Sequence, residues 1–146
     1  MGLDMYLTAK QYLWNHKEEE QHLRKDVAKV LGVTAYDAKS VSFDVMYWRK
    51  CNAIHNWFVD NVQEGLDDCG EYWVDSAQLD ELVALCNEAL VNRDEDILKP
   101  VSGFFFGSTE KDEYYWQSIT ETRDRLSEIL TNPSAVNWDF YYQSSW

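Results

Sequence analysis

Four stretches of the chain have the residue pattern of β-strands: residues 3–7, 41–48, 71–74 and 138–146. The alternation in residues 41–48 predicts one face formed by Val41, Phe43, Val45 and Tyr47. The opposite face then carries Ser42, Asp44, Met46 and Trp48. In the C-terminal stretch the same spacing predicts that Phe140 and Tyr142 share a face, opposite Asp139, Tyr141 and Gln143.

Four further stretches repeat apolar residues at helical spacing. Residues 15–31 carry Leu23, Val27, Val30 and Leu31 on one face, and Gly32 is a natural stop. Residues 50–62 place Ile54, Phe58 and Val62 on one stripe. A helix after Asp75 begins with a capping-box pair, Asp75 and Gln78, and carries Leu79, Leu82, Val83, Cys86 and Leu90. The last helix, residues 111–130, directs Trp116, Ile119, Leu126 and Leu130 inward.

The predicted order of elements is β-α-β-α-β-α-α-β, with residues 93–110 as a loop. This order indicates an α+β fold in which about four helices pack on one face of a small, largely antiparallel sheet of about four strands. Residues 1–146 contain no internal repeat and no linker, and the length suits one domain. We therefore expect a single domain. The loop run from Gly103 to Ser108 has three consecutive phenylalanines, which favours burial in the core over exposure to a partner.

The chain is strongly acidic, with 26 Asp and Glu against 13 Lys and Arg and a formal net charge of −13. Such a charge repels polyphosphates and anionic lipid surfaces, so direct binding to nucleic acid or to a membrane is disfavoured. Seven Trp, nine Tyr and six Phe argue against a disordered acidic chain. Three cysteines without a CxxC pair, and no leader-like or membrane-spanning run, predict a reduced, cytoplasmic protein.

The negative charge is concentrated in one region, because residues 51–92 contain no Lys or Arg. This region holds nine carboxylates: Asp60, Glu64, Asp67, Asp68, Glu71, Asp75, Asp80, Glu81 and Glu88. Asp94, Glu95 and Asp96 extend the trend beyond Arg93. One interpretation is a solvated face without a function. The other is a docking face for a basic partner protein, or a nucleic-acid mimic whose carboxylates stand in for phosphates.

A second group of candidate residues surrounds the start of the acidic region. Arg49 and Lys50 stand where a strand ends and a helix begins, which is a suitable place for an anion. Together with Trp48, His55 and Tyr72 they predict an aromatic pocket for a small anionic ligand such as a nucleotide. The alternative is that both cations only neutralise nearby carboxylates.

Metal and thiol chemistry have weaker support in the sequence. Cys51 and His55 share a helix face and Asp67 to Glu71 follow in a turn, but this spacing matches no zinc signature. A Cys51 nucleophile with His55 as base lacks a third orienting residue, and acidic surroundings would raise the pKa of the thiol. We therefore expect no catalytic residue, no metal and no cofactor.

Several sequence blocks together resemble a family of small bacteriophage and prophage proteins. They are residues 2–7, 47–50, 54–58, 67–72, 103–108 and 139–146, which span nearly the whole chain. The resemblance implies an origin in a mobile element and a role in interfering with a host system. It carries over no activity and no catalytic residue.

These observations lead to a first functional hypothesis and two alternatives. The first is a non-enzymatic phage or prophage protein that acts in the bacterial cytoplasm and blocks a basic site on a host protein, such as a defence or nucleic-acid-binding protein. The second is a protein that sequesters a small anionic ligand in the aromatic pocket. The third is a small hydrolase. A structural or assembly component also stays open.

Overall fold

The computed structural model describes residues 2–94, 96–103 and 106–146. The predicted order of strands and helices is confirmed, and a short 3₁₀ helix, η1, is added before the last strand. The elements are β1 (Asp4–Tyr12), α1 (Glu18–Val30), β2 (Ser40–Arg49), α2 (Asn52–Asn61), β3 (Glu71–Val74), α3 (Ser76–Asn92), α4 (Glu113–Thr131), η1 (Pro133–Asn137) and β4 (Asp139–Ser145). The fold class is α+β, as expected.

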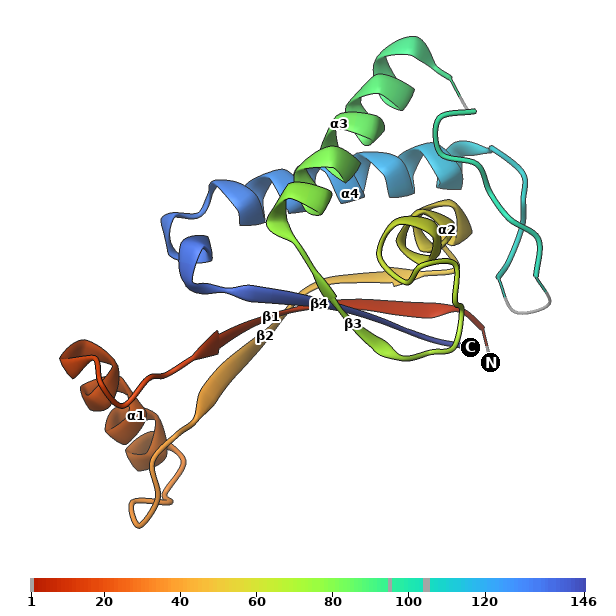
Figure 1. The fold of residues 1–146 in the computed structure, drawn as a ribbon. Coiled ribbons are helices and arrows are strands. Elements are labelled where there is room, and N and C mark those ends of the chain that lie inside the picture. Colours follow the sequence, from red (N-terminus) through yellow and green to blue (C-terminus); the bar gives the residue numbers. More distant parts are fainter. Residues whose placement is uncertain (1, 95, 104–105) are drawn as a thin grey trace.

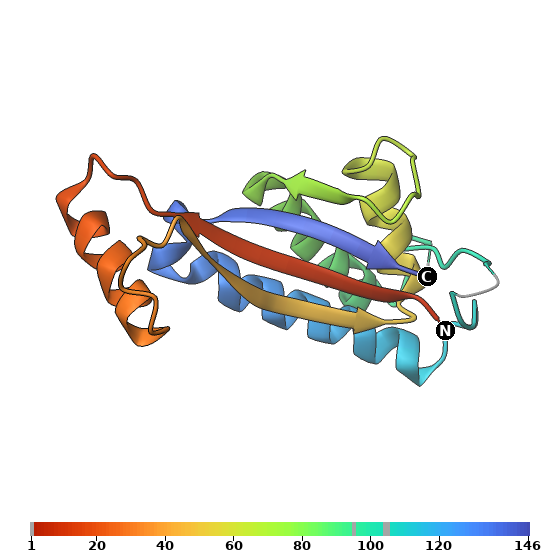
Figure 2. The ribbon, with the colours of Figure 1, turned by 90° about the horizontal axis from the view of Figure 1, so that it is seen from below.

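The four strands form one sheet in the order β2-β1-β4-β3, and every pair is antiparallel. The first and last strands of the chain are thus the two central ones, and the two chain ends lie side by side (Figure 1). Helices α2, α3 and α4 cover one face of the sheet, and within the described ranges no helix covers the other (Figures 1 and 2).

The core lies between the sheet and these three helices. Alternate residues of β1 face the helices, so the strand contributes Met5, Leu7 and Ala9, and Leu3 just before it is also buried. Phe140 and Tyr142 of β4 share this face, as the alternation predicted. The helices contribute fully buried residues in return: Ile54, Phe58, Leu79, Leu82, Cys86, Ile119 and Leu126. Each large apolar side chain that is fully buried contributes about 1.5–3 kcal/mol.

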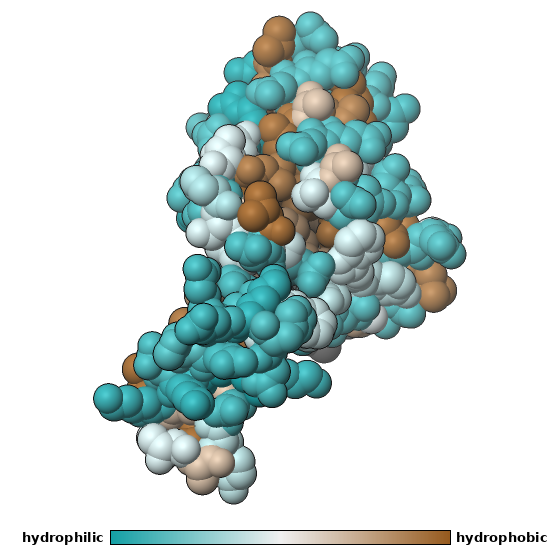
Figure 3. All heavy atoms as spheres, turned by 60° about the vertical axis from the view of Figure 1, so that its left-hand side comes forward, coloured by the Kyte–Doolittle hydropathy of each residue, from teal (hydrophilic) through white to brown (hydrophobic). Residues whose placement is uncertain are grey.

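Helix α1 exists, but its predicted apolar face is not in the core. Val30 is 85% exposed and Leu31 is 70% exposed, and within the helix only Ala28 is buried. The reason is its place in the fold, because β1 and β2 extend beyond the region that the other helices cover (Figure 1). Residues 14–38, which we call the α1 arm, form a separate and largely hydrophilic lobe in Figure 3.

The alternation predicted for residues 41–48 is also wrong in part. Tyr6 pairs with Tyr47 and Leu7 with Met46, but Thr8 pairs with Asp44, so Val45 is an extra residue in β2. This β-bulge shifts the alternation by one position. Asp44 therefore lies on the same face as Tyr47, and not on the face of Trp48.

The remaining predictions concern element ends and loops. Residues 93–110 hold no helix or strand in their described part. Of the three phenylalanines in this loop, Phe106 packs against the core and residues 104–105 lie outside the described residues. No helix in the described part of the chain has the length and apolar character needed to cross a bilayer.

Candidate functional site

A buried hydrogen-bond network centres on His55 of α2. Seven of the ten residues of this helix are buried. Phe58 stacks on Tyr142 of the sheet, and the Asn52 amide donates to the carbonyls of Phe106 and Ser108. His55 is 1% exposed, in contrast to the accessible site residue that the sequence predicted. A buried imidazole needs a hydrogen-bond partner on each nitrogen, because an unpaired polar group in the interior is costly.

Both nitrogens of His55 have such a partner. Nδ1 lies 2.7 Å from the Tyr142 hydroxyl of β4, and Nε2 lies 3.0 Å from Asp67 Oδ2. The ring of Tyr142 stacks on Phe58 with 3.8 Å between centroids. Burial, followed by the charge of Asp67, raises the pKa of Tyr142 well above its ordinary value. The phenol is therefore neutral, and its ring stacks on Phe58.

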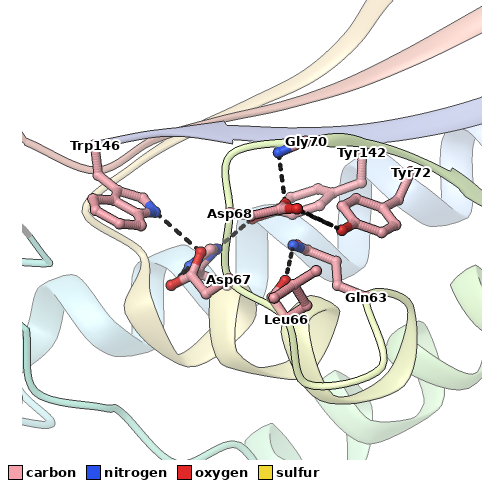
Figure 4. A network of polar contacts seen from close by, with 9 residues as sticks. Gln63, Leu66, Asp67, Asp68, Gly70, Tyr72, Tyr142 and Trp146 are labelled. Carbon is pink, nitrogen blue, oxygen red and sulfur yellow. Dashed lines mark hydrogen bonds and ion pairs between the residues drawn. The ribbon is translucent and has the colours of Figure 1, made fainter.

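The loop between α2 and β3 extends this network to the surface (Figure 4). Asp67 Oδ1 accepts a hydrogen bond of 3.0 Å from Nε1 of Trp146, the last residue of the chain. Asp68 accepts hydrogen bonds from the Gly70 amide and from the Tyr72 hydroxyl, and desolvation together with this carboxylate raises the pKa of Tyr72. Two predicted acidic residues are thus engaged in fixing the loop and the C-terminus.

The arrangement of tyrosine, histidine and aspartate is that of a proton relay, but its position argues for a structural role. Tyr142 has no exposed surface and His55 almost none, so neither group can contact a substrate. The hydrogen bonds join α2, the α2–β3 loop, β4 and the chain end. The network therefore orders the loop that carries Asp67 and Asp68 and leads into β3 at Glu71.

The other predicted acidic residues differ in burial and in hydrogen bonding. Asp75 is half-buried and caps α3, with its side chain accepting from the Ala77 amide while Gln78 completes the capping box. The other six are exposed: Asp60, Glu64, Glu71, Asp80, Glu81 and Glu88. Among the described residues none of the nine carboxylates pairs with a Lys or Arg, and only Asp67 contacts a histidine, His55.

The five residues of the predicted aromatic pocket do not come together. Trp48 is 4% exposed and donates from Nε1 to Thr122 Oγ1 at 2.8 Å, inside the core. His55 is buried in the network above, and Tyr72 lies on the edge strand β3. Only Arg49 and Lys50 share a pocket, of about 180 Å³, at the start of α2, where Tyr114 and Ser118 of α4 also line it.

The cysteine chemistry considered above does not fit the structure. Cys51 is buried, and desolvation raises the pKa of its thiol to about 12. Burial does the same for Cys86. The acidic surroundings proposed as the cause contribute less, since only Glu121 adds to the effect at Cys51. In the described ranges no group of three or more His, Cys, Asp or Glu side chains is placed to hold a metal ion.

Sequence reasoning missed that Tyr142 and Trp146 are the partners of His55 and Asp67. The alternation in the last strand predicted that Tyr142 shares a face with Phe140, but not that this face meets His55. Comparison of the chain with protein-family models, with curated proteins and with solved structures gave no match.

Proposed function

We propose that this protein is a non-enzymatic binding protein that engages a basic partner protein. Its contact would be the acidic surface, which we define as the exposed carboxylates Asp60, Glu64, Asp68, Glu71, Asp80, Glu81 and Glu88. The absence of any Lys or Arg from residues 51–92 carries this proposal. Asp4, Glu20, Asp96, Asp124 and Glu128 each lie within ion-pair distance of a Lys or Arg, whereas no described Lys or Arg pairs with the acidic surface.

Unpaired like charges on one surface repel one another and destabilise the folded chain. A basic partner would remove this repulsion and would be attracted from a distance at low salt. The surface also carries apolar anchors, since Trp73 is 53% exposed beside Glu71 and Leu66 is exposed in the preceding loop. Exposed Trp side chains of this kind often supply most of the affinity of an interface.

The resemblance to bacteriophage and prophage proteins supports a bacterial host protein as the partner. Acting in the host cytoplasm, the protein would occupy the basic site of that partner and so interfere with its function. A partner that normally holds nucleic acid fits the charge of the surface.

The proposal can be tested by capture from bacterial lysate at 50, 150 and 500 mM salt. A variant with Glu64→Gln, Glu71→Gln, Asp80→Asn and Glu81→Gln should lose a salt-sensitive partner that the unaltered protein retains at low salt. The matched control carries Glu18→Gln, Glu19→Gln, Asp26→Asn and Asp37→Asn on the α1 arm and should keep it. Equal capture by both variants, or loss from both, would contradict a contact through the acidic surface.

A second candidate function, the binding of a small anion, is favoured by one observation. Arg49 and Lys50 line the pocket at the start of α2 together with the carboxylates Glu110 and Asp112, and the first turn of this helix carries no acidic residue. The amide groups of a helix N-terminus attract anions. The pocket is smaller than the roughly 300–1,000 Å³ of typical ligand sites, so it suits a single phosphate or carboxylate group.

Thermal unfolding with inorganic phosphate and with AMP tests this second function. A ligand at 100 times its dissociation constant stabilises the native state by about 2.7 kcal/mol. The gain should disappear in an Arg49→Gln, Lys50→Gln variant and persist when Lys25 and Lys29 of the α1 arm are replaced instead. No shift with either anion would exclude it.

A further inference from the structure

A groove of about 550 Å³ separates the edge strand β2 from helix α4. Residues 44–47 of β2 line one side, and Glu121, Asp124, Arg125 and Glu128 of α4 line the other. At one end β2 and α4 are tied together, because Trp48 bonds to Thr122 and the Tyr114 hydroxyl donates to the carbonyl of Arg49. Beyond these contacts the strand and the helix leave an open groove.

The groove exposes backbone groups that have no partner within the sheet. Strand β2 is outermost and pairs only with β1. The Lys50 amide donates to the Leu3 carbonyl. In an antiparallel pair, alternate residues direct their backbone N–H and C=O groups toward the neighbouring strand, and the residues between them direct these groups away from it. This hydrogen bond therefore identifies which residues of β2 have backbone groups that point away from β1. Arg49 and Tyr47 are those residues. The Arg49 carbonyl accepts a hydrogen bond from the Tyr114 hydroxyl of α4, as expected for a carbonyl that points away from β1. The amide and carbonyl of Tyr47 likewise point away from β1, toward the groove.

The lining of the groove is predominantly negative. It holds four carboxylates, those of Asp44, Glu121, Asp124 and Glu128, against the single guanidinium of Arg125. Two ion pairs reduce this negative charge: Arg125 Nη1 lies 3.3 Å from Glu128 Oε2, and Arg123 Nε lies 2.8 Å from Asp124 Oδ1. Both carboxylates are more than half exposed, so water screens both pairs. Val45, Met46 and the half-exposed Tyr47 supply an apolar surface beside these charges.

We propose that this groove binds an extended, lysine- or arginine-rich segment of a partner protein, which adds to β2 as a fifth strand. Strand addition to a free edge provides main-chain hydrogen bonds, and alternating side chains of the added strand provide specificity. One face of such a segment would place its cations against Glu121, Asp124 and Glu128 of α4. Its other face would contact Tyr47 and Asp44, which share the face of β2 that points away from the helices. The bulge at Val45 interrupts the edge, which disfavours the pairing of two identical β2 edges.

This inference does not rest on the proposed function, because it concerns the opposite edge of the sheet from β3 and the acidic surface. The two can therefore fail separately. A variant of the groove leaves the acidic surface unchanged, and a variant of the acidic surface leaves the groove unchanged.

The test uses the full-length protein and an acetylated, amidated eight-residue peptide of alternating lysine and valine, followed by isothermal titration. A groove variant carries Asp44→Asn, Glu121→Gln, Asp124→Asn and Glu128→Gln. It should bind at least about tenfold more weakly, since several partly exposed charge pairs are lost together. The matched control, Glu71→Gln, Asp80→Asn, Glu81→Gln and Glu88→Gln, should bind within about twofold of the unaltered protein. Circular dichroism of each variant checks that it is folded.

Two further measurements separate strand addition from simple charge attraction. A peptide methylated on alternate backbone nitrogens keeps its charge but cannot donate along one edge, and it should lose binding. Hydrogen exchange of the Tyr47 amide should slow when the unmethylated peptide is added, whereas Met46 and Trp48, already bonded to β1, should not change. Absence of binding, equal losses in both variants, equal binding of the methylated peptide, or an unprotected Tyr47 amide would each overturn the proposal.

Discussion

His55 Nδ1 lies 2.7 Å from the hydroxyl of Tyr142, and this contact joins the buried helix α2 to the central strand β4. The same imidazole holds Asp67, which in turn holds Trp146. The loop before β3 and the end of the chain are thus fixed through one buried side chain. The position of the loop that carries Asp68 and leads to Glu71 therefore depends on this network.

Replacing His55 should therefore destabilise the whole domain. We expect His55→Leu to lower the free energy of unfolding by about 2–4 kcal/mol, because the Tyr142 hydroxyl is left buried without a partner. Tyr142→Phe should cost less, about 1–2 kcal/mol, since it removes the hydroxyl itself. The two losses should not add in the double variant. Urea unfolding of the four proteins measures this, and a loss below about 0.5 kcal/mol for His55→Leu would contradict it.

The capping box at Asp75 provides a second prediction. Asp75→Ala removes the acceptor for the Ala77 amide, so we expect the stability to fall by about 1 kcal/mol. Asp75→Asn should retain most of it. Asp80→Ala, in the exposed part of α3, is the control and should be neutral or slightly stabilising because alanine favours helix. Thermal unfolding distinguishes these outcomes, and equal melting temperatures for Asp75→Ala and Asp80→Ala would count against the cap.

Local features of this kind were predictable from sequence. The pair Asp75 and Gln78 marks the start of α3, and residues 71–74 were identified as a strand with the bounds that the structure has. That Phe140 and Tyr142 share a face followed from alternation in the same way, although alternation did not say that this face is the inward one. Each of these depends on residues that are close together in the chain.

Features that depend on distant partners were not predictable. His55 bonds to residues 87 and 12 positions away, and residue type alone does not identify them. The apolar stripe of α1 has the pattern of a core helix, but burial requires a neighbour within reach, and the long β1–β2 hairpin takes α1 away from the others. The bulge at Val45 arises from pairing with β1 and leaves no mark in the pattern of β2.

Stability should also fall in alkaline solution. The buried thiols of Cys51 and Cys86 have a pKa of about 12, against 9.0 in the unfolded chain. Between these values the native state holds more protons than the unfolded state, so the free energy of unfolding decreases as pH rises from about 9 to 12. Tyr142, whose pKa is raised above 10.0, acts in the same direction.

The contribution of the thiols can be separated from that of the tyrosines. Urea midpoints measured from pH 8 to 11 should decline less steeply for a Cys51→Ala, Cys86→Ala variant than for the unaltered protein, whatever the difference at pH 8. Identical slopes would show that the two thiols do not titrate differently on folding.

The α1 arm should be dispensable for folding of the rest of the domain. Tyr12 and Ser40 face each other across the β1–β2 ladder, so residues 14–38 return the chain to nearly the point where it left. The hydrogen bond from the Leu13 amide to the Lys39 carbonyl closes this hairpin without the arm. Replacing residues 14–38 by Asn-Gly supplies a two-residue turn whose twist suits antiparallel strands.

We expect this shortened protein to unfold cooperatively, with a melting temperature within several degrees of the full chain, because α1 buries only Ala28. A matched deletion that shortens α3 by one turn should instead cost several kcal/mol, since it removes fully buried leucines. Thermal unfolding by circular dichroism compares the two. A molten or unfolded product from the Asn-Gly protein would show that the arm stabilises the β1–β2 hairpin through contacts beyond Arg24, whose guanidinium donates to the Leu13 carbonyl at 2.8 Å.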